Sequence, residues 1–131
     1  MAKVAKSKKV RPTDGELEIL RVLWAQGPST VRQVHETIAD VKQTSYNTTL
    51  KLLQIMHDKG VAVRDESQRP QLYRAALPES KMQQKLVSDF LHRAFGGSAR
   101  KLVAALTATD ISREELSQIR KLLDELSEKK Q

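Results

Sequence analysis

The chain has 131 residues, enough for one domain with an appendage, and a formal net charge of +7. It contains no cysteine, which excludes disulfides and thiolate metal sites, and no apolar run approaches the roughly 20 residues of a membrane-spanning helix. Because the amino terminus also lacks the apolar centre of a signal peptide, we expect a soluble, cytoplasmic protein without membrane insertion.

The positive charge is concentrated at the amino terminus. Residues 1–12 carry +5, residues 13–78 carry no net charge, and residues 79–131 carry +2. Low hydrophobicity and like charges predict a flexible basic arm over residues 1–12, which either solubilises the chain or contacts phosphates. Any nucleic-acid binding by the folded body must therefore depend on where individual charges lie.

Two amphipathic helices are expected after the arm. A capping-box pattern from Thr13 to Glu16 opens the first, in which Trp24 is expected to anchor the core, and Gly27-Pro28 ends it. Ser29-Thr30 can extend the chain and cap the second helix, Val31 to about Ala39, whose apolar residues recur at i, i+3 and i+7.

The segment before Gly60 combines lysines with hydroxyl and amide side chains, and it has no acid between Asp40 and Asp58. Ser45 is expected to cap a helix over about 45–59, which Gly60 ends in a left-handed conformation. The predicted buried side consists of Leu52, Leu53, Ile55 and Met56. We interpret this helix as a DNA-recognition helix whose amino-terminal half enters the major groove. Its candidate DNA contacts are Lys42, Ser45, Tyr46, Asn47, Thr48 and Lys51.

The chemistry of these side chains suggests different contacts. Asn47 can read adenine, whereas Thr48 can bind a phosphate or contact a thymine methyl group. Lys42 and Lys51 are ordinary surface lysines by default, and any contact that they make with DNA is expected to be with phosphates and to carry no sequence information. Tyr46 either packs against the preceding helix or contacts DNA.

Two β-prone segments follow, at 61–64 and 71–75, with a polar turn over 65–70 between them. Two short strands directly after a recognition helix predict a wing over about 61–75. Arg69 at its tip can reach a phosphate or the minor groove, although Asp65 and Glu66 oppose that interpretation.

Three amphipathic helices are expected beyond Pro78, over about 79–95, over about 98–106, and from a capping-box pattern at Ser112. They have too little mass for a separate core, so we expect them to pack on a second copy of the chain. Such a homodimer places two recognition helices on one face of DNA, about one helical turn or a multiple apart. The candidate dimerisation residues are Phe90, Phe95, Leu102, Leu106, Leu116, Ile119, Leu123 and Leu126.

The expected fold is mainly α with a small β-wing, a winged helix-turn-helix domain over residues 13–78 followed by a helical dimerisation region over 79–131. No arrangement of nucleophile, base and oxyanion donors is recognisable, so we expect neither an enzyme nor a cofactor. The three histidines lie on different predicted helices without a second ligand at i+3 or i+4, which argues against a metal site.

Over roughly residues 13–126 the sequence resembles the penicillinase-repressor family, the BlaI/MecI-type winged-helix repressors of bacteria. The marks that carry this resemblance are Leu23-Trp24 with Gly27, Thr30-Val31 with Val34, Tyr46-Asn47-Thr48, Leu52-Leu53, Lys59-Gly60, Arg69, Tyr73, Phe95-Gly96-Gly97-Ser98 and Leu102-Val103. The resemblance implies a homodimeric repressor that binds double-stranded DNA at a dyad (inverted-repeat) operator.

The sequence also departs from the family. Thr49 stands where relatives usually have an aliphatic residue, and Lys51 stands where they often have threonine. Because Lys51 follows Thr48 by three residues, it shares the groove-facing side, so the operator sequence can differ. The resemblance implies a sensor protease as a partner that ends repression, but residues 104–107 do not match the cleavage site of the antibiotic-responsive members. Without cysteines, the chain also lacks the cluster that copper-responsive members use.

A winged-helix module that binds protein and not DNA is the alternative, because residues 13–78 are electrically neutral overall.

Overall fold

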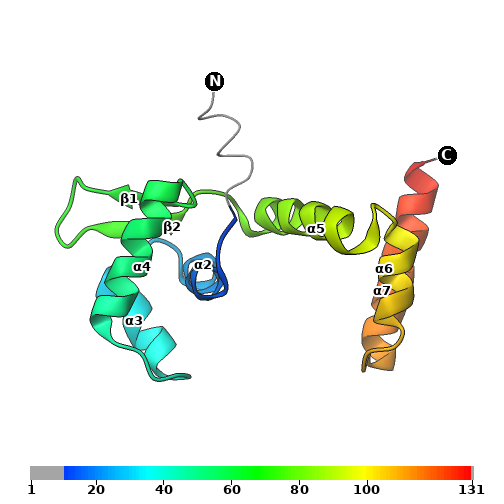
Figure 1. The fold of residues 1–131 in the computed structure, drawn as a ribbon, viewed down its shortest axis with the longest axis horizontal. Helices are drawn as coiled ribbons and strands as arrows, with labels where there is room; N and C mark the ends of the chain where they lie inside the picture. Colours follow the sequence, from blue (N-terminus) through cyan, green and yellow to red (C-terminus); the bar gives the residue numbers. More distant parts are fainter. Residues whose placement is uncertain (1–10, 131) are drawn as a thin grey trace. The chain divides into compact units, whose positions relative to one another are not determined.

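The computed structural model describes residues 11–130, so most of the predicted basic arm lies outside the described residues. This part of the chain contains six helices and one two-stranded antiparallel sheet, which confirms a mainly α fold with a small β-wing (Figure 1). The chain divides into two compact units, one ending at Leu86 and the other beginning at Val87. Among the described helices, none is long and apolar enough to cross a bilayer.

The first unit is a winged helix. Its elements are α2 (Asp14–Gln26), α3 (Val31–Ala39), α4 (Tyr46–Lys59), β1 (Ala62–Asp65) and β2 (Leu72–Ala75). The capping box predicted at Thr13 is confirmed, and Thr30 forms a second one with Gln33. In each box the threonine hydroxyl accepts from an amide of the first turn, which fixes where the helix begins.

The two strands pair in an antiparallel register that places Arg64 opposite Tyr73. Ser29, in the link between α2 and α3, also forms an antiparallel bridge with Tyr73 of β2. The amide of Ser29 donates to the Tyr73 carbonyl at 2.9 Å, and the Tyr73 amide donates back at 2.8 Å. These bonds connect the base of the wing to the helical part of the unit.

The core lies between the three helices and the base of the wing. Its most deeply buried apolar side chains are Ile19, Leu20, Leu23, Val34, Leu53 and Met56. Trp24 is half-buried against this cluster, and its indole N–H donates to the Leu77 carbonyl at 2.9 Å, so it anchors the core as predicted. The prediction that Ile55 is buried was wrong. Its side chain is 37% exposed because the buried stripe of α4 runs through Leu53 and Met56, on the other side of the helix.

The remaining helices are α5 (Glu79–Phe95), α6 (Ala99–Leu106) and α7 (Arg113–Lys129). In the first turns of α5, Met82 is buried and Leu86 packs against the core of the winged helix, so the first unit ends inside this helix. Ser112 caps α7 by accepting from the Glu115 amide at 3.1 Å. The full capping box predicted there was wrong, since the structure records no return bond from the Glu115 side chain in this described segment.

Candidate nucleic-acid interface

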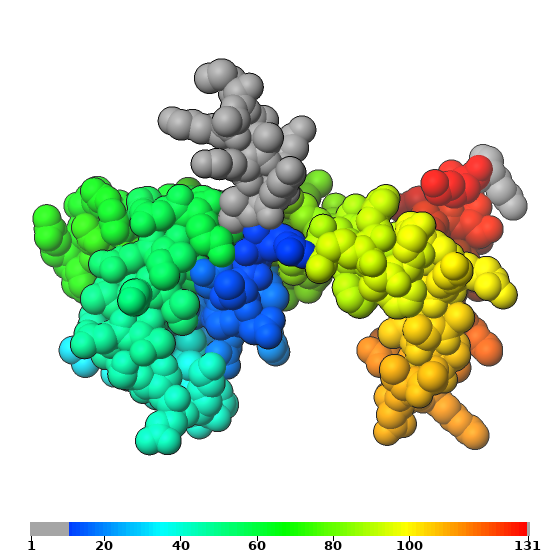
Figure 2. Space-filling model, in the orientation of Figure 1, coloured from blue at the N-terminus to red at the C-terminus, as the bar shows by residue number. Residues whose placement is uncertain are grey.

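Helix α4 has one buried and one exposed side. Ser45 is its N-cap, as predicted, and Gly60 ends it at a φ of 82°, a left-handed conformation that glycine adopts without steric cost. The buried side contains Leu53 and Met56 together with Thr49, which is only 1% exposed. The α4 surface turned away from this core lies next to the wing on the face that Figure 2 shows.

The exposed side of α4 presents a continuous polar stripe. Asn47, Lys51 and Gln54 are all exposed, and their spacing of four and three residues places them on one face of the helix. Asn47 and Lys51 were predicted contacts, whereas Gln54 had not been assigned a role. Amide side chains can form paired hydrogen bonds with base edges, and lysine favours phosphates, so this stripe has the chemistry of a groove-reading surface.

Tyr46 lies at the start of α4 and packs against α3. Its ring makes an edge contact with His35 at a centroid distance of 5.9 Å, and the Arg32 guanidinium lies over the ring at 5.9 Å. Because 40% of Tyr46 is still exposed, the contact with α3 orients the ring without removing it from the surface. Packing against α3 and contact with DNA, the two alternatives for Tyr46, are therefore compatible.

Ser45 and Thr48 are joined at the beginning of α4. Their hydroxyl oxygens lie 2.9 Å apart, and the Thr48 amide donates to the Ser45 hydroxyl at 3.1 Å. Both residues are exposed. Each hydroxyl therefore has a local partner that limits its rotation.

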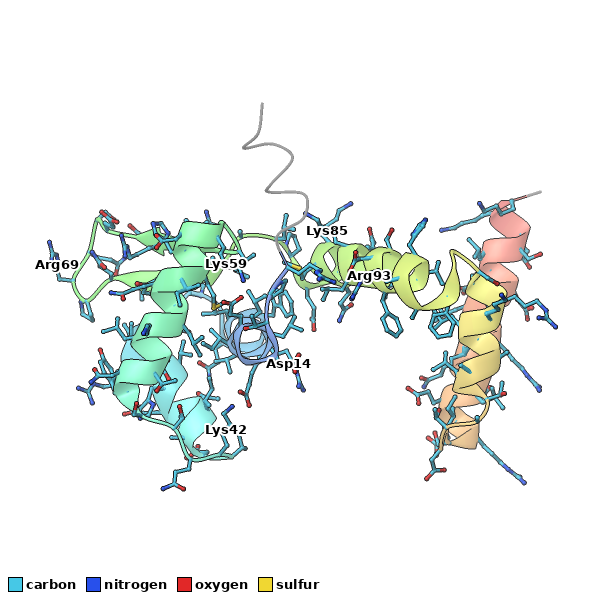
Figure 3. The ribbon with its side chains drawn as sticks, in the orientation of Figure 1. Asp14, Lys42, Lys59, Arg69, Lys85 and Arg93 are labelled. Carbon is cyan, nitrogen blue, oxygen red and sulfur yellow. The ribbon has the colours of Figure 1, made fainter. Side chains whose placement is uncertain are left out.

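Lys42 has an intramolecular partner. Its ammonium lies 2.8 Å from a carboxylate oxygen of Glu18 in α2, and the two side chains are 51% and 33% exposed. Figure 3 shows Lys42 in the segment that precedes α4, while Arg69 lies in the wing. The ion pair ties the α3–α4 connection to α2, so in this structure Lys42 points to a protein carboxylate.

The wing presents Arg69 at its tip. The turn before it is closed by Asp65, whose carboxylate accepts from the Ser67 amide at 2.9 Å and from the Ser67 hydroxyl at 2.6 Å. These hydrogen bonds to Ser67 lower the pKa of Asp65 below its ordinary value. Asp65 is thus directed into the turn, and Arg69 is exposed beyond it.

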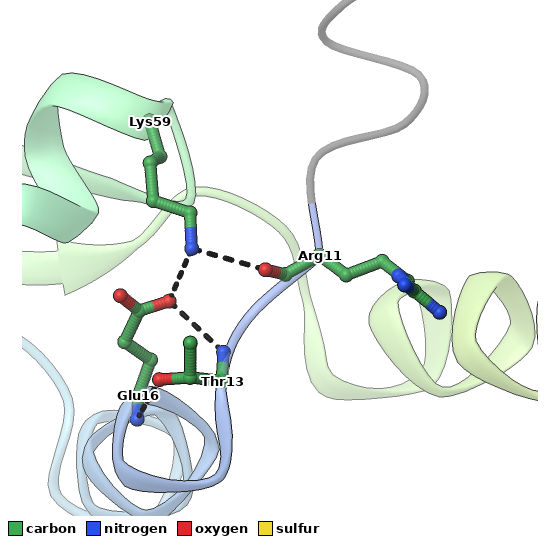
Figure 4. Close-up of polar contacts among 4 residues, drawn as sticks. All are labelled: Arg11, Thr13, Glu16 and Lys59. Atoms are coloured by element: carbon green, nitrogen blue, oxygen red, sulfur yellow. Dashed lines mark hydrogen bonds and ion pairs between the residues drawn. The ribbon is translucent and has the colours of Figure 1, made fainter.

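The carboxyl-terminal end of α4 is fixed by a buried carboxylate (Figure 4). Glu16 is 2% exposed and accepts from the Lys59 ammonium at 2.7 Å and from the Thr13 amide at 3.1 Å. Lys59 also donates to the Arg11 carbonyl at 3.0 Å. The glutamate that completes the capping box of α2 therefore also holds the last turn of α4. This contact helps to fix the position of α4 relative to α2.

Arg32 is the functional candidate that sequence reasoning missed. It lies in the first turn of α3, an end of the helix that favours anions over cations, and its guanidinium lies over the ring of Tyr46. Periodicity did not reveal it, because its position on Tyr46 depends on the packing of two helices.

The histidines have no converging ligands in the part of the chain that the structure describes, where no group of three or more histidine, cysteine or acidic side chains could hold a metal. His35 instead lies 3.5 Å from the Thr49 hydroxyl, and the ring of His92 contacts the Ser88 carbonyl at 2.9 Å.

The family model described as "Penicillinase repressor" matches residues 12–125. The chain belongs to this family. This confirms the resemblance inferred from the sequence, and the matched range covers most of each compact unit.

Similar members of the family come from several bacteria. The chain is 26% identical over 121 residues to "Transcriptional regulator BlaI" of Mycobacterium tuberculosis (strain CDC 1551 / Oshkosh), covering 92% of this chain and 88% of the relative. It is 24% identical over 119 residues to "Penicillinase repressor" of Bacillus licheniformis, covering 90% and 93%. It is 22% identical over 113 residues to "Methicillin resistance regulatory protein MecI" of Staphylococcus aureus (strain N315), covering 86% and 92%.

Proposed function

We propose that this protein is a homodimeric transcriptional repressor that binds an inverted-repeat operator in double-stranded DNA. The observation that carries the proposal is the exposed stripe of Asn47, Lys51 and Gln54 on a capped helix whose opposite side is locked into the core. Membership of the family of penicillinase repressors supports the same function. The proposal assigns the chain no reaction and places it in the cytoplasm, where a bacterial chromosome is found.

In this proposal α4 enters the major groove with its amino-terminal half. Asn47 and Gln54 read base edges, Lys51 binds a phosphate, and Ser45 and Thr48 contact the backbone next to the first turn. Arg69 at the tip of the wing binds a phosphate or enters the minor groove. Lys42 joins these contacts only if DNA replaces Glu18 as its partner.

The homodimer is proposed from the surface of the second unit. Phe90 in α5 and three leucines of α7, Leu116, Leu123 and Leu126, are between 41% and 51% exposed, so this small unit leaves several large apolar side chains in contact with solvent. A second copy that covers this surface would remove it from water and would bring two α4 helices to one operator. A sensor protease that ends repression is a further proposed partner, without an assigned cleavage residue.

The test is selection of binding sites from a random pool of duplexes, followed by competition between the selected site and random DNA. We expect a palindromic site, and Asn47→Ala should reduce the preference for it by about 1–3 kcal/mol, the size of one base-reading contact. Gln118→Ala, which removes an exposed amide from α7, serves as the matched control and should leave the preference unchanged. A pool that yields no palindrome would contradict the proposal.

A winged-helix module that binds protein is the second candidate, and the zero net charge of residues 13–78 favours it. A salt titration on random duplex separates the two. Binding that weakens steeply with salt supports the repressor, because phosphate contacts release counterions. Negligible affinity at low salt supports the protein-binding module. Affinity that disappears only when residues 1–12 are removed would assign binding to the arm alone.

A further inference from the structure

A hollow of about 480 Å³ lies between α3, α4 and the wing, all within the first compact unit. Three arginines line it: Arg32 from α3, and Arg64 and Arg69 from the wing. Tyr46 and Gln54 of α4 form another part of the wall. We refer to this hollow as the arginine cleft. Guanidinium groups bind phosphate with parallel hydrogen bonds, so three of them around one hollow suit a phosphodiester backbone.

Arg64 differs from the other two arginines because its guanidinium already forms an ion pair with a carboxylate. Its Nε and Nη2 atoms lie 2.9 and 2.8 Å from the same oxygen of Glu66. Hydrogen bonds to Tyr73 and to Glu66 raise the pKa of Arg64 above its ordinary value. The Arg64 side chain is 24% exposed, whereas that of Glu66 is 57% exposed.

The two members of this pair are held to different degrees. Arg64 stands in β1 opposite Tyr73 of β2, and Tyr73 is only 2% exposed, so the arginine has a rigid neighbour. Glu66 lies beyond the end of β1, in the exposed turn of the wing. A carboxylate that is more than half exposed regains water readily when it is displaced, and exposed ion pairs are weak.

We propose that Arg64 is a ligand for a DNA-backbone phosphate and that Glu66 occupies this position in the free protein until a phosphate replaces it. The inference rests on the proposed function, since it assigns the duplex that α4 reads as the source of the phosphate. Arg32 and Arg69 line the same cleft and attract the backbone segment that reaches Arg64. Glu66 then lowers affinity for every duplex alike and contributes nothing to sequence preference.

The test uses the full chain and random-sequence duplex, with affinity measured over a range of salt concentrations. Glu66→Gln removes the competing charge and keeps the size of the side chain. We expect it to raise affinity by roughly two- to fivefold, the strength of an exposed ion pair, without changing the salt slope. The control is Glu128→Gln, which changes the net charge equally but lies in the last turn of α7, in the other compact unit.

Arg64→Gln removes the ligand itself and should reduce the log-log salt slope by about 0.9, the contribution of one phosphate contact. Arg64→Lys retains the charge and should restore most of that slope, which a loss of folding in Arg64→Gln would not predict. In the Arg64→Gln background, Glu66→Gln should raise affinity by a smaller factor than it does in the unmodified protein, because the carboxylate no longer has an arginine to occupy.

Two results would overturn the inference about Arg64 without contradicting the proposed repressor function. One is a salt slope of Arg64→Gln equal to that of the unmodified protein; the other is a Glu66→Gln affinity equal to that of Glu128→Gln. If the unmodified protein does not bind duplex even at low salt, the proposed function itself fails. The two failures are therefore distinguishable in one set of titrations.

Discussion

Replacing Lys59 by methionine tests whether the buried Glu16 carboxylate depends on its cation. The substitution keeps most of the aliphatic length and removes the ammonium, which lies 2.7 Å from Glu16. Glu16 then retains only the amide of Thr13 among the partners shown in Figure 4, in a site where its side chain is 3% exposed. Leaving a buried charge without its partner is the costly change in such pairs.

The expected loss in the free energy of unfolding follows from the burial of Glu16 and Lys59. Removing one member of a fully buried pair costs about 3–5 kcal/mol, whereas exposed pairs contribute about 0–1 kcal/mol. Lys59 is 25% exposed, so solvent reaches this pair from one side. We therefore expect Lys59→Met to lower the free energy of unfolding by about 2–3 kcal/mol, between these limits.

Urea unfolding at a fixed protein concentration measures the effect, with exposed Lys85→Met as a control that should stay within about 0.5 kcal/mol. The decisive variant is Glu16→Gln combined with Lys59→Met. Glutamine can keep the acceptor of the capping box, so the double variant should be more stable than Lys59→Met alone. A double variant less stable than Lys59→Met would refute the reasoning, since the loss would then not come from an unpaired buried charge.

Three further outcomes are expected. Leu53→Ala removes a side chain that is 0% exposed and should cost about 2–5 kcal/mol in the same urea experiment. Because the pKa of Asp65 is lowered in the folded wing, its contribution to stability is complete above the ordinary carboxyl range and is lost as pH falls through the lowered pKa. An NMR titration that follows the Ser67 amide should show this transition at low pH, and a transition at or above the ordinary pKa would contradict it. Leu123→Ser with Leu126→Ser should convert a dimer to single chains at micromolar concentration in sedimentation, whereas an unchanged mass would exclude these leucines from the interface.

Local chemistry explains why the ends of α4 could be predicted from the sequence. Ser45 accepts from an amide three residues ahead, and Gly60 adopts a conformation that other residues disfavour, so both signals act within one turn of the helix. The wing was located equally well, since two β-prone segments flank a polar turn. Strand limits shifted by one residue, from 61–64 to Ala62–Asp65 for β1.

Partners far apart in the chain could not be predicted. Lys42 binds Glu18 and Arg32 lies over Tyr46, and both contacts depend on how the helices pack. Hydrophobicity was misleading for Ile55, since this aliphatic residue was expected to be buried and is exposed. Burial in α4 follows the direction in which each side chain points, and hydrophobicity alone did not determine that direction.

The charge balance of the winged helix looks at first like an argument against DNA binding. A duplex, however, responds to charges within about 8–10 Å at physiological ionic strength and not to the total. Within the first unit, two glutamates of α2 form ion pairs: Glu16 with Lys59, and Glu18 with Lys42. The three arginines line a cleft on the side of α4 that adjoins the wing, where Glu66 pairs with Arg64. A net charge of zero over residues 13–78 and a cleft lined by three arginines are thus consistent, and this cleft is where we propose that the DNA backbone binds.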